Sequence, residues 1–436
     1  MSIIEIEDIR KPETSQNWIN EKLFLGFTVK EYVKRLFTPF NMFAGLIVLI
    51  GAIFILERFI FGLDKITEAS NEQPWGLLLG VGLFTGVPFS ASGFVVGTAV
   101  YIFGLKKYRP VVKNAILLGF LGYLFAVVFL MIDLGRPWRI YYPMVISFGP
   151  ASVMFLVAWH VSLYLTVQAF EFSPSAFDWL GLKKIRKWVL GMTIALTIAG
   201  IMLSTLHQSA LGAMFLLAPG KLHPLWYTSY LPWLHLITAI AGGLVFVVVV
   251  SKLVLVFMKD RVEPSYRDNL DNITLGIGKA TSFILFTYVG LRLSSIAYEN
   301  AWGYINTPFG HWFLLEFMLF AALPFMFYYG VKIRNVGLVQ FSALLTMVAI
   351  IINRLNISII AFNWKLPGHE LFFWKEGVVV LSVLTIEILV YRWIVNRMPV
   401  LSDETHVKDL KPGVVFSGGL WRWRINLHLK IPVTLY

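Results

Sequence analysis

The sequence predicts an all-α integral membrane protein with about ten transmembrane helices and both termini in the cytoplasm. Apolar residues make up 57% of its 436 residues, charged residues only 14%, and the mean hydropathy is +0.71. A soluble domain of this length would carry far more charge, so the excess apolar surface is expected to face lipid. A second observation is that the apolar residues gather into runs of membrane-spanning length. A third is that basic residues concentrate in alternate loops.

Ten runs of about 20 apolar residues lie between clusters of charged or turn residues. The predicted spans are Phe40–Phe61, Trp75–Gly104, Asn114–Ile132, Pro143–Phe170, Trp188–Leu217, Leu231–Met258, Leu275–Ala297, His311–Tyr329, Val336–Ala361 and Gly377–Ile394.

The orientation follows from the lysine and arginine residues. If the N-terminus is cytoplasmic, the inner segments hold 28 of the 37 basic residues. Cytoplasmic loops of membrane proteins carry this excess of positive charge. Because alternate loops carry the charge, we expect an even number of spans. We expect the membrane to be the cytoplasmic membrane of a prokaryote.

The charge pattern divides the chain into three parts. Residues 1–39 form a predicted cytoplasmic or interfacial segment, residues 40–396 the transmembrane domain, and residues 397–436 a cytoplasmic tail. The first 38 residues lack an early apolar region, so no cleavable signal peptide is expected. Within them, Trp18–Phe37 mixes lysines with leucine, phenylalanine and valine, which is typical of an interfacial helix on anionic lipid. A linker that docks on a partner subunit fits this stretch equally well.

Cysteine is absent from the whole chain. The chain therefore cannot ligate an iron–sulfur cluster through thiolates, attach a c-type haem or form a disulfide. The net charge of +12 could suggest nucleic-acid binding, but the charges lie in short loops between apolar spans rather than on one exposed face. Redox chemistry would need a quinone, a non-covalent haem or another subunit.

Polar residues gather in the outer half of the predicted spans, where charged groups are costly unless they face a cavity or a partner. They are Asp133, Arg136, His207, Gln208, His235, Arg292, Glu316, Asn353 and Arg354. The predicted cofactor-binding residues are Arg136, Gln208, His235, Arg292 and Arg354, together with Ser204. A quinone headgroup needs hydrogen-bond donors for two oxygens and moves two protons, and a histidine with a carboxylate supplies both functions. The same residue types also serve as hydrogen bonds between helices.

Two further interpretations concern the same residues. Haem b needs two histidines at matching depth on facing helices, and His207 and His235 are a pair to consider. Glu316, Glu387 and His160 could belong to a proton path, although each could equally be a packed, hydrogen-bonded group. His160 and Glu387 are predicted to lie in the inner half of the membrane.

Three stretches resemble one family of membrane subunits. The block LSTLHQSALGAMFLLAPGKLHPLWY at Leu203–Tyr227 closely resembles the large membrane subunit of certain nickel–iron hydrogenases. The other two are GFLGY at Gly119–Tyr123, followed by DLGRPWR at Asp133–Arg139, and the Gly86–Pro88 bend, followed by YIFGLKKYRP at Tyr101–Pro110. The chain thus resembles the NrfD/polysulfide-reductase (PsrC-like) membrane-subunit superfamily over about residues 40–395.

The resemblance implies four-helix bundles and a menaquinone pocket near the outer face. It implies electron exchange with a ferredoxin-like iron–sulfur subunit docked on that face. The matching polar positions are Asp133, Arg136, His207 and Gln208, with Asp133 and His207 handling protons. Further partners would be a multihaem cytochrome c and a cytochrome b membrane subunit. Such a chain is not catalytic alone but is a quinone oxidoreductase subunit of a larger complex.

The motifs also bear on which branch of the family the chain resembles. The hydrogenase branch is expected to carry an acidic residue where Leu156 stands, and DLGRPWR is more similar to subunits linked to sulfite reduction. We therefore expect a sulfite-reduction-linked complex of the DsrMKJOP type, with a hydrogenase-type subunit as the alternative. A secondary ion or small-anion transporter is the rival from another class, because the Gly86–Pro88 and Gly149–Pro150 breaks fit interrupted helices. A purely structural membrane anchor is a third.

Overall fold

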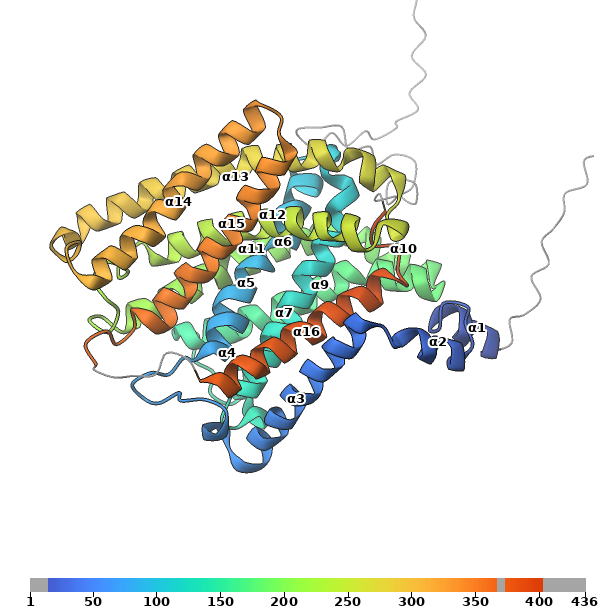
Figure 1. Cartoon of the computed structure of the whole chain (residues 1–436), viewed down its shortest axis with the longest axis horizontal. Coiled ribbons are helices and arrows are strands. Elements are labelled where there is room, and N and C mark those ends of the chain that lie inside the picture. Colours follow the sequence, from blue (N-terminus) through green and yellow to red (C-terminus); the bar gives the residue numbers. More distant parts are fainter. Residues whose placement is uncertain (1–14, 367–372, 403–436) are drawn as a thin grey trace, which may run out of the picture.

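A computed structural model describes residues 15–366 and 373–402 of the chain. Ten of its helices are long and apolar enough to cross a membrane, as the sequence predicts. Within the described residues, the one β contact is an isolated bridge between Leu222 and Phe362. The protein is therefore an all-α, multi-pass membrane protein (Figure 1).

The first four-helix bundle is built from the second to fifth spans. The second span, Leu77–Ile102, is a stack of short pieces that includes α5 (Gly86–Phe89) and α6 (Ser92–Gly97). It packs on α7 (Arg109–Asp133), which contacts α9 (Val153–Leu180), which in turn contacts α11 (Thr193–Met214). We call this group bundle 1.

The second bundle follows directly along the chain. Its members are α12 (Leu231–Phe257), α13 (Pro264–Tyr298), α14 (Pro308–Lys332) and α15 (Val336–Leu355), which we call bundle 2. Helix α12 also packs on α11, α5 and α6, so it joins the two bundles.

The first and last spans form a separate pair on the outside. Helix α3 (Pro39–Phe61) packs along α16 (Trp374–Val395), which contacts α7 and the start of the second span, α4 (Leu77–Leu79) (Figure 1). The pair is fastened by an ion pair in which Lys375 Nζ lies 2.9 Å from Glu57 Oε1.

Alternate loops define two faces of the molecule. The face that carries α1 (Ser15–Lys22), α2 (Val29–Leu36) and residues 396–402 is called the terminal face. It also carries α10 (Lys183–Gly191). The opposite face, called the distal face, carries residues 62–76, 134–152, 218–230, 299–307 and the described part of 361–373.

The second span lies in the interior of the molecule, and 83% of its most apolar window is buried against only 11% for α3. Glycine permits this close packing. A Cβ atom on Gly243 of α12 would lie 2.6 Å from the backbone nitrogen of Ser92, a separation that side chains do not tolerate. The span also contains two π-helical segments, Gly80–Thr85 and Thr98–Ile102, a form of helix that often marks functional sites.

Most predicted spans differ from the structure by a few residues at their ends, and three differences matter here. The fourth helix begins at Val153 rather than Pro143, because the chain breaks at Gly149–Pro150 and forms only the short α8 (Tyr142–Val145) before it. It therefore continues to Leu180. The seventh helix begins eleven residues early, at Pro264, with proline in its first turn. The fifth is preceded by a separate helix, α10.

The segment predicted as one interfacial helix, Trp18–Phe37, consists of two helices. A turn at residues 23–28 separates α1 from α2, and Thr28 with Glu31 forms a capping box that starts α2. The predicted tail lies outside the described residues beyond Ser402.

Candidate functional site

A group of polar side chains is buried between α7, α9 and α11 in bundle 1. We call it the His207 cluster, and its members are Tyr123, Tyr164, Ser204, His207 and Gln208, each at most 1% exposed. Ser204, His207 and Gln208 share one face of α11 because residues three and four apart in a helix are neighbours.

The cluster is held together from three helices. Gln208 Nε2 donates to Val87 O at 3.0 Å and lies 3.4 Å from the Tyr123 hydroxyl. The Tyr123 ring lies 4.6 Å from the Tyr164 ring and 5.6 Å from the His207 ring, centroid to centroid. The Ser204 hydroxyl lies beside both tyrosine hydroxyls.

Several polar atoms of the cluster have no hydrogen-bond partner within the described residues. They include both ring nitrogens of His207 and the amide oxygen of Gln208, with His160 Nδ1 on the neighbouring helix α9. A buried polar group without a partner costs about 1–3 kcal/mol. The cluster can therefore donate to and accept from a polar ligand group.

The structure places His160 differently from the sequence prediction. It lies seven residues after the start of α9 at Val153, in the distal half, where it interacts electrostatically with His207. The prediction of an inner position was wrong because it began the span ten residues too early.

Asp133 and Arg136 lie apart from the His207 cluster. Asp133 ends α7, ten residues or about 15 Å of helix beyond Tyr123. Its electrostatic neighbours are Arg58 of α3 and Glu376 of α16. Arg136 is exposed on the distal face. The four positions that the sequence grouped together therefore belong to two places.

Glu316 lies at the centre of a second polar network, in bundle 2. Trp226 Nε1 donates to it at 2.8 Å and Asn353 Nδ2 at 2.6 Å, and Asn356 donates to the same carboxyl group. Three donors thus satisfy this 4% exposed carboxylate.

The remaining predicted site residues belong to this network or lie beside it. Arg354 donates to Thr238 Oγ1 at 2.6 Å and to His235 O at 3.2 Å. Arg292 donates to Leu225 O at 2.8 Å. His235 Nδ1 is 3.1 Å from Leu231 O, and its Nε2 has no partner among the described residues. The Arg292 contact, together with that of Trp226 to Glu316, ties the loop at 218–230 to bundle 2.

His223 anchors the same distal loop and was not singled out by the sequence. Its ring stacks on Phe309 at 4.9 Å and meets Trp364 at 4.6 Å, and its Nδ1 accepts the Leu225 N–H at 3.2 Å. Burial lowers the pKa of His223 to about 4.

No group of three or more histidine, aspartate or glutamate side chains that could hold a metal ion is found in residues 15–366 and 373–402. The rings of His207 and His235 have different neighbours, Tyr123 for the first and Phe215 for the second.

Four polar residues of bundle 1 were missed by the sequence analysis. Tyr123 and Tyr164 resemble members of an interfacial aromatic belt, and Gln168 is one polar residue in an apolar run. Glu171 fell just outside the predicted fourth span, which ended at Phe170. A longer span would have placed this carboxyl group in the membrane.

The fold and the buried cluster define a multi-pass membrane protein with a polar site inside a helical bundle. The model of the family "Polysulphide reductase, NrfD" matches residues 65–363, and the chain belongs to this family. It is an NrfD-family membrane subunit of the kind that occurs in respiratory oxidoreductase complexes.

Three relatives show how the chain compares with known proteins. A protein of Nitratidesulfovibrio vulgaris is 41% identical over 379 residues, covering 86% of this chain and 98% of the relative. The probable Ni/Fe-hydrogenase 2 b-type cytochrome subunit of Escherichia coli K12 is 29% identical, covering 83% and 92%. The integral membrane subunit of menaquinone reductase of N. vulgaris is 25% identical, covering 62% and 68%.

Proposed function

We propose that the chain binds menaquinone at the His207 cluster and exchanges its electrons with an iron–sulfur subunit on the distal face. The observation that carries the proposal is that both ring nitrogens of His207 are buried beside Tyr123 and Gln208 and have no hydrogen-bond partner among the described residues. A relative named as a menaquinone reductase subunit supports the choice of ligand.

The residues of the cluster fit a quinone headgroup. A neutral histidine both donates and accepts a hydrogen bond, so His207 can donate to a quinone oxygen or accept from a quinol hydroxyl. Gln208, Tyr123 and Ser204 supply further hydrogen-bonding groups. The quinone supplies the two-electron redox chemistry when bound, and the protein orients its oxygens and handles the protons.

Met202 and Leu206 mark the lipid-facing side of α11, where they are 61% and 50% exposed. The His207 cluster lies on the opposite side of α11, so the apolar tail of a quinone would enter between helices of bundle 1.

Asp133 lies at the distal end of α7 rather than beside His207, and it is proposed as an alternative proton route to the distal face. Arg136, which is exposed there, is a proposed contact for the redox partner. The proposed electron route needs no haem. His235, Arg292 and Arg354 are proposed to shape bundle 2 beside the site. Glu316, Glu387 and His160 remain a proposed proton path.

The particular complex is also a proposal. The DLGRPWR form at Asp133–Arg139 favours a sulfite-reduction-linked assembly of the DsrMKJOP type, with cytochrome subunits as further partners. The similarity to a hydrogenase 2 subunit favours a hydrogenase-type assembly as the alternative. Both assign this chain the same quinone chemistry.

The test uses the complex purified from native membranes with menadiol as the probe. We expect His207→Ala to slow menadiol-dependent electron transfer to the iron–sulfur partner on the order of a hundredfold, because proton transfer at the quinone loses its acceptor. The control, His311→Ala, changes an exposed histidine of α14 and should keep the wild-type rate. Equal rates for both variants and the wild type would refute the assigned site.

A further inference from the structure

A line of polar side chains leads from the His207 cluster towards the terminal face. We call it the polar file, and its members are Tyr123, Tyr164, Gln168, Glu171 and Thr197. The first two belong to the cluster, and the other three lie progressively closer to the terminal ends of α9 and α11. None of the last three has a part in the proposed quinone site.

The first step of the file is a direct hydrogen bond. Gln168 Nε2 donates to the Tyr164 hydroxyl at 2.7 Å, while Gln168 Oε1 has no partner among the described residues. Gln168 is fully buried between three helices. It fits only because Gly119 of α7 has no side chain, since a Cβ there would lie 2.6 Å from Gln168 Nε2.

The second step reaches Glu171, one helical turn beyond Gln168 on α9. Thr197 Oγ1 donates to Glu171 Oε1 at 3.3 Å across to α11. Gly200 of α11 leaves space between Tyr164 and Glu171. A Cβ atom at this position would fit at ordinary contact distances, 3.5 Å from Tyr164 Cε2 and 4.0 Å from Glu171 Oε2. The turn between Gln168 and Glu171 would be bridged by water.

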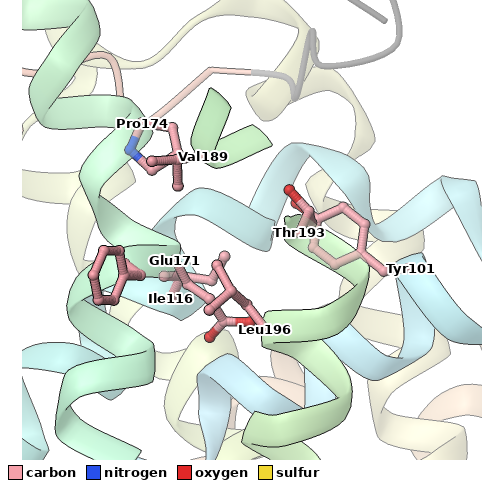
Figure 2. Close-up of a pocket in the computed structure, with 8 residues that line it drawn as sticks. Tyr101, Ile116, Glu171, Pro174, Val189, Thr193 and Leu196 are labelled. Atoms are coloured by element: carbon pink, nitrogen blue, oxygen red, sulfur yellow. The ribbon is translucent and has the colours of Figure 1, made fainter. Parts of the chain in front are cut away.

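Glu171 also lines a small cavity near the terminal face. The cavity has room for about one water molecule. Figure 2 shows Glu171 among its lining residues, with Thr193 and Leu196 of α11 and Val189 of α10. Beyond it towards the terminal face, Arg186 of α10 forms an ion pair with Asp178, N to O 2.8 Å.

We propose that Glu171 exchanges protons between the terminal face and the His207 cluster through the polar file. The inference rests on the proposed quinone site. Reduction of one quinone takes two electrons from the iron–sulfur partner and two protons. Each proton leaves the Glu171 carboxyl group towards His207, and water at the cavity returns a proton to the carboxylate. Quinol oxidation runs the same steps in reverse.

The groups around Glu171 suit this role. Its polar neighbours are Tyr164 on its own helix, Tyr101 at the end of the second span, and Thr193 and Thr197 on α11. The nearest ion pair, Asp178 with Arg186, lies about two turns away along α9. Glu171 is thus a carboxyl group with hydroxyl neighbours and no paired cation among its described contacts, so it can gain and lose a proton without breaking an ion pair.

The competing route runs to the distal face through Asp133. The two routes predict opposite sides for proton exchange, because Glu171 and Asp133 lie near opposite ends of bundle 1. In the proposal, Glu171→Gln abolishes proton exchange at the terminal face and Asp133→Asn does not.

The experiment uses the purified complex in proteoliposomes whose orientation is known, with menadiol and a pH-sensitive dye on one side. We expect Glu171→Gln to lower the turnover and the terminal-side pH change on the order of a hundredfold, while the KM for menadiol stays the same. Glu171→Asp keeps a carboxyl group and should recover part of both signals. Glu31→Gln, which changes an exposed glutamate of α2 on the same face, serves as the matched control.

The outcomes separate the two proposals. Wild-type turnover and terminal-side pH change in Glu171→Gln would overturn the role of Glu171, as would a loss of the signal only in Asp133→Asn. If Glu171→Gln fails to fold, Glu171→Asp is used instead. An unchanged pH dependence of menadiol turnover in Glu171→Asp would then overturn the role of Glu171 as well. A wild-type complex that transfers no electrons with menadiol would instead refute the quinone site itself.

Discussion

Buried polar side chains in this molecule fall into two groups at the residue scale. Glu316 receives three N–H donors and contributes to the packing of bundle 2. His207 keeps two nitrogens without a partner among the described residues. The first arrangement is satisfied within the chain, whereas the second leaves polar atoms available to the proposed quinone. This contrast, rather than burial itself, distinguishes the candidate site.

The sequence identifies part of the candidate site from residue type and depth. His207, Gln208 and Ser204 stand out because polar groups are rare in apolar spans. Tyr123 and Gln168 do not stand out, because their roles depend on which helices meet across the bundle. That pairing, which also separates Asp133 from His207, is set by tertiary packing and leaves no local pattern in one sequence.

The buried ring of His223 predicts a pH-dependent stability of the distal loop. Its pKa is about 4 in the folded chain against 6.5 ordinarily, so the unfolded chain binds more protons between these values. Its stabilising contribution is complete above pH 6.5 and is lost as the pH falls towards 4. The melting temperature in detergent should fall by several degrees over this range, since about 1 kcal/mol corresponds to about 2–4 °C.

Substitution tests the assignment of this pH dependence. His223→Phe keeps an aromatic ring against Phe309 but does not titrate, so its melting temperature should change less between pH 6.5 and 4. His311→Phe, at an exposed histidine, should keep the wild-type dependence. An unchanged pH dependence in His223→Phe would contradict the prediction.

At the scale of elements, all ten spans were predictable because the lipid core demands about 20 apolar residues in each. The helix ends were less predictable. Helix α13 extends eleven residues before its predicted start, and α9 begins ten residues late. The helices extend beyond the lipid core through polar residues, and hydropathy does not reveal their ends there.

Helix α2 is predicted to lie on the membrane surface at the terminal face. Val29, Val33 and Leu36 are exposed on one side, with Lys34 turned away from them. Arg397 donates to the Tyr32 hydroxyl at 2.7 Å and so fastens the helix beside the end of α16. The apolar side is therefore available to lipid, and the basic residues to anionic headgroups.

The absence of cysteine makes this prediction directly measurable. Spin labels at Val33→Cys and Lys34→Cys probe adjacent positions in an otherwise cysteine-free chain. In anionic vesicles, the label at position 33 should be relaxed more by oxygen and the label at 34 more by a water-soluble nickel complex. Equal accessibility to nickel at both positions would favour a solvated linker, and protection of both from either reagent a docked partner.

At the scale of the whole molecule, the two faces differ in charge. The terminal-face loops hold basic groups such as those at Lys183, Lys184 and Lys187 of α10, while the distal segment at 299–307 has none. This imbalance predicts a cytoplasmic terminal face. The iron–sulfur partner of the proposal would then lie outside the cytoplasm.

Single cysteines also test the orientation. Ser70→Cys on the distal face should react with a membrane-impermeant maleimide in cells with a permeable outer layer. Lys184→Cys on the terminal face should react only after the cytoplasmic membrane is opened. Both positions are exposed in the structure. Labelling of Lys184→Cys in sealed cells would reverse the assigned topology and the proposed location of the redox partner.

The glycine-rich second span, Leu77–Ile102, has a consequence for biosynthesis. In the finished protein it is surrounded by α7, α12 and α15. Yet it emerges from the ribosome before any of these helices and meets bare lipid without them. Its glycines and its π-helical segments then lack the neighbours that complete their packing. Stable insertion of this span therefore depends on helices that are made later. The span with the largest buried share of the ten is the second to be synthesised.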